Sequence, residues 1–298
     1  MPTSSRSTLP VALAALAIAT LLAACGGTSA APAGSAATAE QSDAATTRPA
    51  DFIDHPTGST DVVLRVGEEG GFVMMEYAMA RVPRFTLYGD GRVLISTPVE
   101  CKAAPGGSCP PDALRQAYLT EDQVQAVLRT ALVDGQLGVA KEEFPVNVMD
   151  VPTTVIELHA GGVDKEVRVA GLGMDAPPGP DAAVLASLAA LVDKLMAIPT
   201  TDEYTAASSI AILAETEAAP GVTPAPWPWP ELAPSDFAKP PPDDPFGFTT
   251  RVLTPAECEA LGITPGEPAG PLTFAGPDGK TYVVVVRPAL PDEVPGAA

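Results

Sequence analysis

The chain has 298 residues, of which 37 are acidic and 17 are Lys or Arg, so its formal net charge is −20 at pH 7. An excess of negative charge this large argues against binding to nucleic acid or to anionic lipid headgroups, because both would repel the chain. Hydrophobic residues make up 46% of the sequence, which is ample for one large folded domain or two small ones.

The N-terminus has the pattern of an export signal. Arg6 precedes an apolar stretch at residues 9–24, which is shorter than the ~20 residues that a membrane-spanning helix needs. The stretch ends in Leu-Ala-Ala-Cys at 22–25, and this run resembles the lipobox of bacterial lipoproteins. We therefore expect residues 1–24 to be cleaved as a signal peptide and Cys25 to be lipidated. An ordinary secretory signal and a short buried helix are the alternatives.

Residues 25–57 consist largely of Ala, Ser, Thr, Gly and Pro and show no apolar periodicity. Such a segment cannot bury enough apolar surface to offset the entropy that ordering costs, so we expect it to be a disordered tether. A coil of about 25 residues spans roughly 25–30 Å, which would hold the folded part close to a membrane.

The folded part is expected to begin at residue 58 with a region rich in strands. Strands are predicted at 62–66 and 71–79 around a Gly-Glu-Glu-Gly turn, and at 84–88 and 92–96 around a Gly-Asp-Gly turn. The Asp-Gly pair between two apolar runs favours a hairpin, because such a turn needs residues that tolerate positive φ.

A helix and a second hairpin are predicted next. Thr120–Gln123 is a capping box, and apolar residues at helical spacing follow it as far as Gly135. The segment 153–169 reads as two strands that turn at Gly161-Gly162.

A second helix is expected to start at Asp181, as its cap, and to end before Pro199. The stretch 208–215 fits helix or strand, and we favour a strand. The order hairpin, helix, hairpin, helix predicts that residues 58–219 form an α+β domain, with an antiparallel sheet and the helices on one of its faces.

The segment 220–245 differs in composition, with ten prolines around Trp227 and Trp229. It is expected to be either a stiff linker or a strap that lies on the fold. Exposed tryptophans on a proline-stiffened backbone could contact a partner protein, whereas in a strap they would dock on their own domain. Residues 246–293 are expected to be a β-rich extension packed on the same domain, with one short helix around Cys258.

Cysteine usage fits an exported protein. Cys101 and Cys109 bracket a flexible loop, and we expect them to form a disulfide in an oxidising compartment, with two free thiols as the alternative. The bridge would contribute about 2.5 kcal/mol in the chain-entropy model. Cys258 is expected to be a buried, inert thiol, although pairing with one of the other two stays open.

Residues that could carry chemistry are sparse. His55 and His159 have no spacing typical of a metal site, and no Gly-x-Ser-x-Gly motif is present. The acidic pairs at 68–69, 142–143 and 243–244 are interpreted as solvated turns. No catalytic residue, metal or cofactor is therefore predicted. A cleft that holds two carboxylates would favour an enzyme, and a flat apolar patch near Trp227 would favour binding.

Four stretches carry a resemblance to a known group. These are Val-Pro-Arg-Phe-Thr-Leu-Tyr-Gly-Asp-Gly-Arg-Val at 82–93, Leu-Thr-Glu at 119–121, Asp-Val-Pro-Thr-Thr at 150–154, and Val-Arg-Pro-Ala-Leu-Pro-Asp-Glu at 286–293. The chain resembles a group of uncharacterised exported proteins and lipoproteins of high-GC Gram-positive bacteria. The resemblance covers most of residues 60–293 and implies a fold and a location, but no catalytic residue.

Taken together, the sequence predicts a non-catalytic binding or interaction protein at the outer face of the cell membrane. Its expected partners are the membrane, through lipid on Cys25, and an envelope protein, but no nucleic acid. The alternative is an envelope hydrolase whose acidic pair is assembled by the fold.

Overall fold

The computed structural model describes residues 49–97, 112–174, 179–218, 223–240 and 246–294. These residues belong to one compact unit, Arg48–Ala298. Strands predominate over helices and form two mixed sheets, so the fold is of the α+β class. Cys25, Cys101, Cys109 and the acidic pair 243–244 lie outside the described residues.

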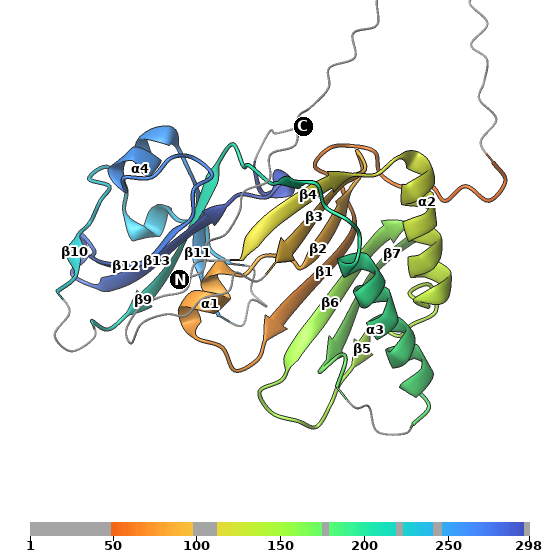
Figure 1. Ribbon diagram of the computed structural model, residues 1–298. Coiled ribbons are helices and arrows are strands. Elements are labelled where there is room, and N and C mark those ends of the chain that lie inside the picture. The colour runs from red at the N-terminus through yellow and green to blue at the C-terminus, as the bar shows by residue number, and fades with distance from the viewer. Residues whose placement is uncertain (1–48, 98–111, 175–178, 219–222, 241–245, 295–298) are drawn as a thin grey trace, which may run out of the picture. The chain divides into compact units, whose positions relative to one another are not determined.

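The first sheet has the strand order β5-β7-β6-β1-β2-β3-β4-β8 (Figure 1). Its strands are β1 (Val62–Gly70), β2 (Phe85–Tyr88), β3 (Arg92–Thr97), β4 (Ala113–Tyr118), β5 (Glu143–Phe144), β6 (Pro152–Ala160), β7 (Val163–Ala170) and β8 (Asp202–Glu203). Neighbouring strands are antiparallel except β5 and β7, which pair in parallel.

The second sheet has the order β10-β12-β13-β9-β11. Its strands are β9 (Ser209–Thr216), β10 (Ala225–Pro226), β11 (Thr249–Leu253), β12 (Ala269–Ala275) and β13 (Thr281–Pro288), and β10 and β12 are its parallel pair. Strand β9 comes from the segment 58–219, whereas β11 to β13 come from 246–293. One sheet therefore spans the boundary expected at residue 219.

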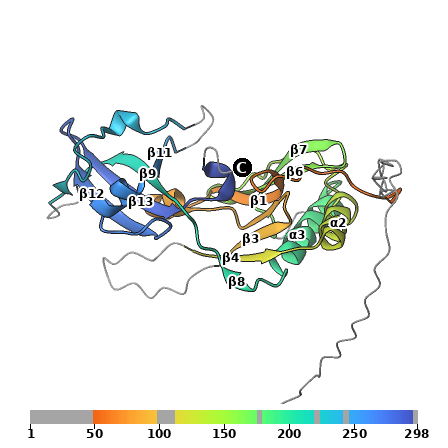
Figure 2. The same cartoon turned by 90° about the horizontal axis from the view of Figure 1, so that it is seen from above.

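Four α-helices and three shorter helical turns complete the described structure. They are α1 (Met75–Ala80), α2 (Glu121–Arg129), α3 (Ala182–Met196) and α4 (Pro255–Ala260), a π-helical turn at Thr130–Asp134, and 3₁₀ turns at Pro234–Asp236 and Pro291–Glu293. Both views show α2 and α3 side by side on the same face of the first sheet (Figure 2).

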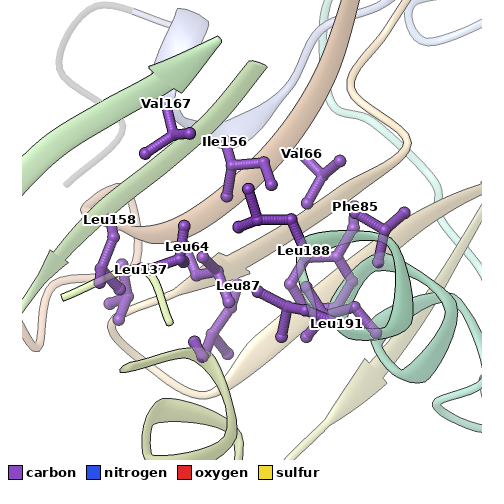
Figure 3. Close-up of a cluster of buried hydrophobic side chains, with 14 of the residues drawn as sticks. Leu64, Val66, Phe85, Leu87, Leu137, Ile156, Leu158, Val167, Leu188 and Leu191 are labelled. Atoms are coloured by element: carbon purple, nitrogen blue, oxygen red, sulfur yellow. The ribbon is translucent and has the colours of Figure 1, made fainter. Parts of the chain in front are cut away.

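The core of the first sheet follows from the two-residue period of its strands. Leu64 and Val66 of β1 and Ile156 of β6 point to the side that α2 and α3 cover, where Leu188 and Leu191 of α3 meet them (Figure 3). The alternate residues of the same strands point to the opposite face and are largely polar. This is the alternation expected of strands that are packed on one face only.

The segment 71–79 was expected to be a strand, and that prediction is wrong. Strand β1 continues through Glu68 and Glu69, because Thr154 and Thr153 of β6 pair with them. The chain then turns at Gly70 and Gly71, both with positive φ, and forms the short helix α1. Met74 and Met75 consequently lie at a loop and a helix start, not on opposite faces of a strand.

The folded part begins earlier than residue 58. The backbone N–H of Ile53 donates to Oε1 of Gln125 in α2 at 2.8 Å, and the Gln125 amide donates back to the Ile53 carbonyl at 2.9 Å. The His55 side chain is also buried, with 3% of its surface exposed. A tether would therefore end near residue 49.

Candidate functional site

A groove of about 840 Å³ lies at one edge of the first sheet. Its walls are the first turns of α3, the end of β7 and the loop that follows β5. Ala182, Ala186 and Ala189 lie on one side of α3 at helical spacing, and their small side chains leave room along the helix. From Asp181 to Ala189 the helix rises about 12 Å at ~1.5 Å per residue, so the groove is elongated. We refer to it as the α3 groove.

The α3 groove is lined mostly by apolar side chains, with Asn147 as an uncharged polar residue among them. Its charged residues are Lys141 and Asp181, whose Nζ and Oδ2 atoms lie 2.6 Å apart and neutralise each other. The Lys141 ammonium also lies 4.7 Å from the centre of the Phe144 ring. With its two charges paired at the rim, the groove offers an apolar surface and no net charge to a ligand.

Helix α3 is apolar around most of its circumference. Between residues 182 and 192, Ser187 is the one polar side chain. Its buried face, which includes Leu188 and Val192, packs into the core, whereas Ala186 and Ala190 are exposed. A helix that is hydrophobic on all sides is normally buried on all sides. Among the described residues, nothing fills the groove beside α3, so this apolar side of the helix is less covered than a helix of such composition normally is.

Asp181 was expected to cap this helix through its side chain. It occupies the N-cap position, but its carboxylate accepts no capping hydrogen bond and pairs with Lys141 instead. The residue that marks the helix start thus forms part of the groove rim.

A second concavity, of about 660 Å³, lies on the polar face of the first sheet. Arg65 of β1, Glu157 of β6 and Glu166 of β7 stand side by side in register across its floor. Phe246 and Phe248 form part of its wall, with their rings stacked 5.3 Å apart. We call it the charged cleft.

Most carboxylates of the charged cleft are paired with arginines. Arg168 donates to Glu69 and, at 2.9 Å, to Glu166, and these hydrogen bonds raise its pKa. Glu68 accepts from Arg84 at 2.9 Å. Glu68 and Glu69 therefore belong to a strand and its ion pairs, and the prediction of a solvated turn is wrong.

Glu157 differs from its neighbours. Within the described part of the chain, no Lys, Arg or His nitrogen lies within 4.0 Å of its carboxylate. Burial lowers the pKa of Arg65, but the charges of Asp292 and, to a smaller extent, Glu157 raise it, and the net pKa is raised. Glu157 stands directly opposite Glu166, and such cross-strand pairs have Cβ atoms about 4.5–5.5 Å apart. The fold thus does bring two carboxylates together in a cleft.

Trp227 and Trp229 lie within the core of the second sheet. The Trp229 side chain is 3% exposed, and its Nε1 donates to the Glu257 carbonyl at 3.0 Å. Nε1 of Trp227 donates to the Leu232 carbonyl at 2.6 Å, and the two rings meet edge to face at 5.3 Å. This is the arrangement expected of a strap, in which Trp229 is buried and Trp227 is half-buried.

The remaining candidates form no further centre of chemistry. His55 and His159 both line an open pocket of about 790 Å³, where His159 pairs with Asp164 at 2.8 Å. Among the described residues, no group of three His, Cys, Asp or Glu side chains could hold a metal ion. Cys258 is a buried thiol without a disulfide, as expected, and burial raises its pKa.

Sequence reasoning missed the α3 groove. The available signal was the alanine-rich helix 182–196 with apolar residues on every side, preceded by the glycines at 171, 173 and 179. Neither feature has the form of a catalytic motif.

In the part of the chain that the structure describes, no helix combines the length and the apolar character needed to cross a membrane. Comparison with known proteins finds no family model, curated protein or solved structure that matches the chain.

Proposed function

We propose that this protein is an exported, lipid-anchored binding protein of the cell envelope that holds a hydrocarbon chain in the α3 groove. The observation that carries the proposal is the apolar side of α3 that no described residue fills, at Ala182, Ala186 and Ala189, above a groove whose two charges pair with each other. A linear acyl chain fits this surface because it needs no hydrogen-bonding partner and can follow the helix.

The hydrophobic effect sets how long the hydrocarbon chain must be for its burial to outweigh the free-energy cost of association. Each methylene group removed from water contributes about 0.8 kcal/mol, so ten buried groups contribute roughly 8 kcal/mol. Association itself costs at least ~4 kcal/mol in lost freedom. A short-chain acid would therefore bind weakly, and the expected ligand is a long acyl chain such as that of a fatty acid or a phospholipid.

Other parts of the proposal rest on the sequence. Lipid on Cys25 would anchor the chain at the outer face of the cell membrane, as the resemblance to exported lipoproteins of high-GC Gram-positive bacteria implies. A disulfide between Cys101 and Cys109 belongs to the same proposal. So does the grouping of the first sheet into two hairpin–helix units.

The test is ligand binding by the mature chain, Cys25 to Ala298, with Cys25→Ser to prevent lipidation. We expect saturable binding of the fluorescent fatty acid cis-parinaric acid. Ala186→Phe should fill the groove and raise the Kd about tenfold or more, equivalent to ~1.4 kcal/mol. Ala190→Phe is the matched control, because Ala190 is also an exposed alanine of α3 but does not line the groove. Equal binding by both variants would refute the proposal.

The charged cleft supports a second candidate function, hydrolysis by the pair Glu157 and Glu166. Retaining glycosidases use two carboxyl groups about 5–5.5 Å apart, and Glu157 and Glu166 stand opposite each other on adjacent strands, so their side chains could bring the carboxyl groups to such a separation. Chromogenic glycosides and esters would be screened with the mature chain. This function requires that Glu157→Gln abolish any turnover found, while Glu143→Gln, at an exposed position on β5, leaves it unchanged.

A further inference from the structure

Several large apolar side chains are exposed on three loops at one end of the first sheet. Phe72, after β1, is 89% exposed, and Met149, before β6, is 87% exposed. Met74, Val148 and Met174 are exposed on the same three loops. Figure 1 shows the loop after β1 and the loop before β6 at the lower end of this sheet.

The three loops meet around Pro152. Gly71 of the first loop lies against Pro152, and the Phe72 N–H donates to the Asp150 carbonyl at 3.2 Å. Gly171 of the third loop donates its N–H to the Pro152 carbonyl at 2.9 Å. The exposed side chains therefore belong to one continuous surface, which we call the loop tip.

Few charges lie among the described residues of the loop tip. The stretches 71–75, 145–151 and 171–174 contain one charged residue, Asp150, while Glu76 and Asp175 directly follow the first and third of them. Continuous apolar surfaces of this kind on a folded protein usually mark a site of interaction with a membrane or with another molecule.

The loop tip is continuous with the α3 groove. Val148 and Met174 line the groove and are also exposed at the tip. A hydrocarbon chain at the tip would therefore already contact two apolar side chains of the groove, Val148 and Met174.

We propose that the loop tip enters the interfacial region of the lipid bilayer, so that the α3 groove takes its ligand directly from the membrane. This inference rests on the proposed function, and it adds the source of the ligand and the surface that reaches it. Phe and Met side chains on protruding loops suit insertion between lipid headgroups, because their apolar surface is then removed from water.

The proposed anchor permits this orientation. The chain enters the fold at the far end of β6, where the Gly161 N–H donates to the Asp54 carbonyl at 2.7 Å. From there to Pro152 the strand is about 27 Å long, at ~3.4 Å per residue. Residues 25–48 number 24 and can reach at most roughly 85 Å. Lipid on Cys25 and the loop tip can thus contact one membrane at the same time.

The anchor also favours a bilayer over a protein as the occupant. Lipid on Cys25 would keep the loop tip beside the membrane at a high effective concentration, so that even a weak apolar contact becomes occupied. Because the chain carries a net charge of −20, this contact should not depend on anionic headgroups.

The experiment places a tryptophan on the loop tip. The mature chain carries Cys25→Ser and an N-terminal hexahistidine, which attaches it to phosphatidylcholine vesicles that contain a nickel-chelating lipid. The matched variants are Phe72→Trp and Tyr118→Trp. Tyr118 is also exposed, at 63%, and it pairs with Arg92 at the opposite end of the sheet. The vesicles contain either ordinary or acyl-brominated phosphatidylcholine, and bromine quenches only a tryptophan that reaches the acyl region.

We expect the added emission of Phe72→Trp to be quenched about twofold by the brominated vesicles, and that of Tyr118→Trp to be unchanged. Equal quenching of the two variants would overturn the inference. So would a shift of Phe72→Trp emission that depends on protein concentration and occurs without vesicles, because the tip would then bind a second copy of the chain. Binding of cis-parinaric acid without vesicles is measured on the same variants. If cis-parinaric acid still binds but Phe72→Trp is not quenched, membrane insertion of the loop tip is refuted and the proposed function of the α3 groove is not affected.

Discussion

At the scale of single residues, Asp292 joins the C-terminal segment to the first sheet. The Tyr88 hydroxyl donates to one of its carboxylate oxygens at 2.7 Å, and the Arg65 guanidinium donates to the other at 2.7 Å. Tyr88 is fully buried, and burial together with the nearby Asp292 charge raises its pKa. Tyr88 therefore remains a neutral hydrogen-bond donor to this carboxylate at any ordinary pH.

We predict that Asp292→Ala lowers the free energy of unfolding by about 2–4 kcal/mol, because it leaves the Tyr88 hydroxyl and the Arg65 cation without their acceptor. Adding Tyr88→Phe should recover part of the loss, since the unpaired hydroxyl is removed. The control is Asp164→Ala, because Asp164 is 88% exposed and its pair with His159 should contribute less than ~1 kcal/mol. Urea denaturation measures all four chains, and equal losses for the two Ala variants would contradict the prediction.

The buried tyrosines also predict how stability depends on pH. Burial and the hydrogen bond to Asp278 raise the pKa of Tyr282 to about 12, against about 10 for an exposed tyrosine. Below pH 10 the ring is neutral in both the folded and the unfolded chain. As the pH rises from 10 to 12, the unfolded chain loses this proton first, so the free energy of unfolding should fall.

Tyr282→Phe should reduce this alkaline loss relative to the parent chain. Chemical denaturation at pH 9 and pH 11 measures the difference. An identical pH dependence for the two chains would show that Tyr282 does not contribute.

At the scale of secondary-structure elements, helix α4 depends on a capping box. The Thr254 hydroxyl accepts from the Glu257 N–H at 3.3 Å, and the Glu257 carboxylate accepts from the Thr254 N–H at 2.7 Å. The Glu257 carbonyl also receives the Trp229 Nε1–H, so the helix start holds the strap in place. We predict that Thr254→Ala costs about 1 kcal/mol of unfolding free energy, whereas Thr254→Ser, which keeps the hydroxyl, costs less. Urea denaturation distinguishes the two, and equal costs would mean that the cap is unimportant.

Local sequence signals predicted those elements whose cause is local. The capping box at Thr120–Gln123 is present, with both of its hydrogen bonds. The Gly-Asp-Gly turn joins β2 to β3, and Gly91 there has the positive φ that the turn requires. The segment 246–293 is rich in strands, as expected, and the apolar run Val283–Val286 is buried on both faces of β13.

Elements whose cause lies elsewhere in the chain could not be predicted in this way. The residues after Gly70 are apolar and favour strand, but β1 already has β2 and β6 as neighbours, so the chain turns into α1. Strand β4 lacked a clear pattern and forms because β3 offers it a partner. The α3 groove depends on the distance between a helix and the loop after β5, which only the folded chain determines.

At the scale of the whole described molecule, a segment next to a strand of each sheet packs against the other sheet. Met79 of α1 packs with Ile210 and Val283 of the second sheet. In return, Leu290 packs against Tyr88 and Leu94 of the first sheet. The backbone hydrogen bonds within each sheet thus coexist with apolar contacts that connect the two sheets.

This reciprocal packing predicts that the two sheets unfold together. Trp227 and Trp229 report on the second sheet through their fluorescence, and far-ultraviolet circular dichroism reports largely on α2 and α3, which cover the first sheet. In urea the two signals should change at the same midpoint, because neither sheet keeps its packing without the other.

The double variant Met79→Ala with Leu290→Ala should separate the two midpoints, because it removes apolar contacts between the sheets at both places. Each substitution should lower the free energy of unfolding by about 2–5 kcal/mol. A matched pair of truncations, Leu188→Ala with Leu213→Ala, removes similar volume from the interior of each sheet's own core and should lower both midpoints without separating them. Two separate midpoints in the parent chain would show that the sheets are independent. In that case the loss caused by Asp292→Ala should appear in one of the two transitions alone, because the partners of Asp292, Tyr88 and Arg65, both lie in the first sheet.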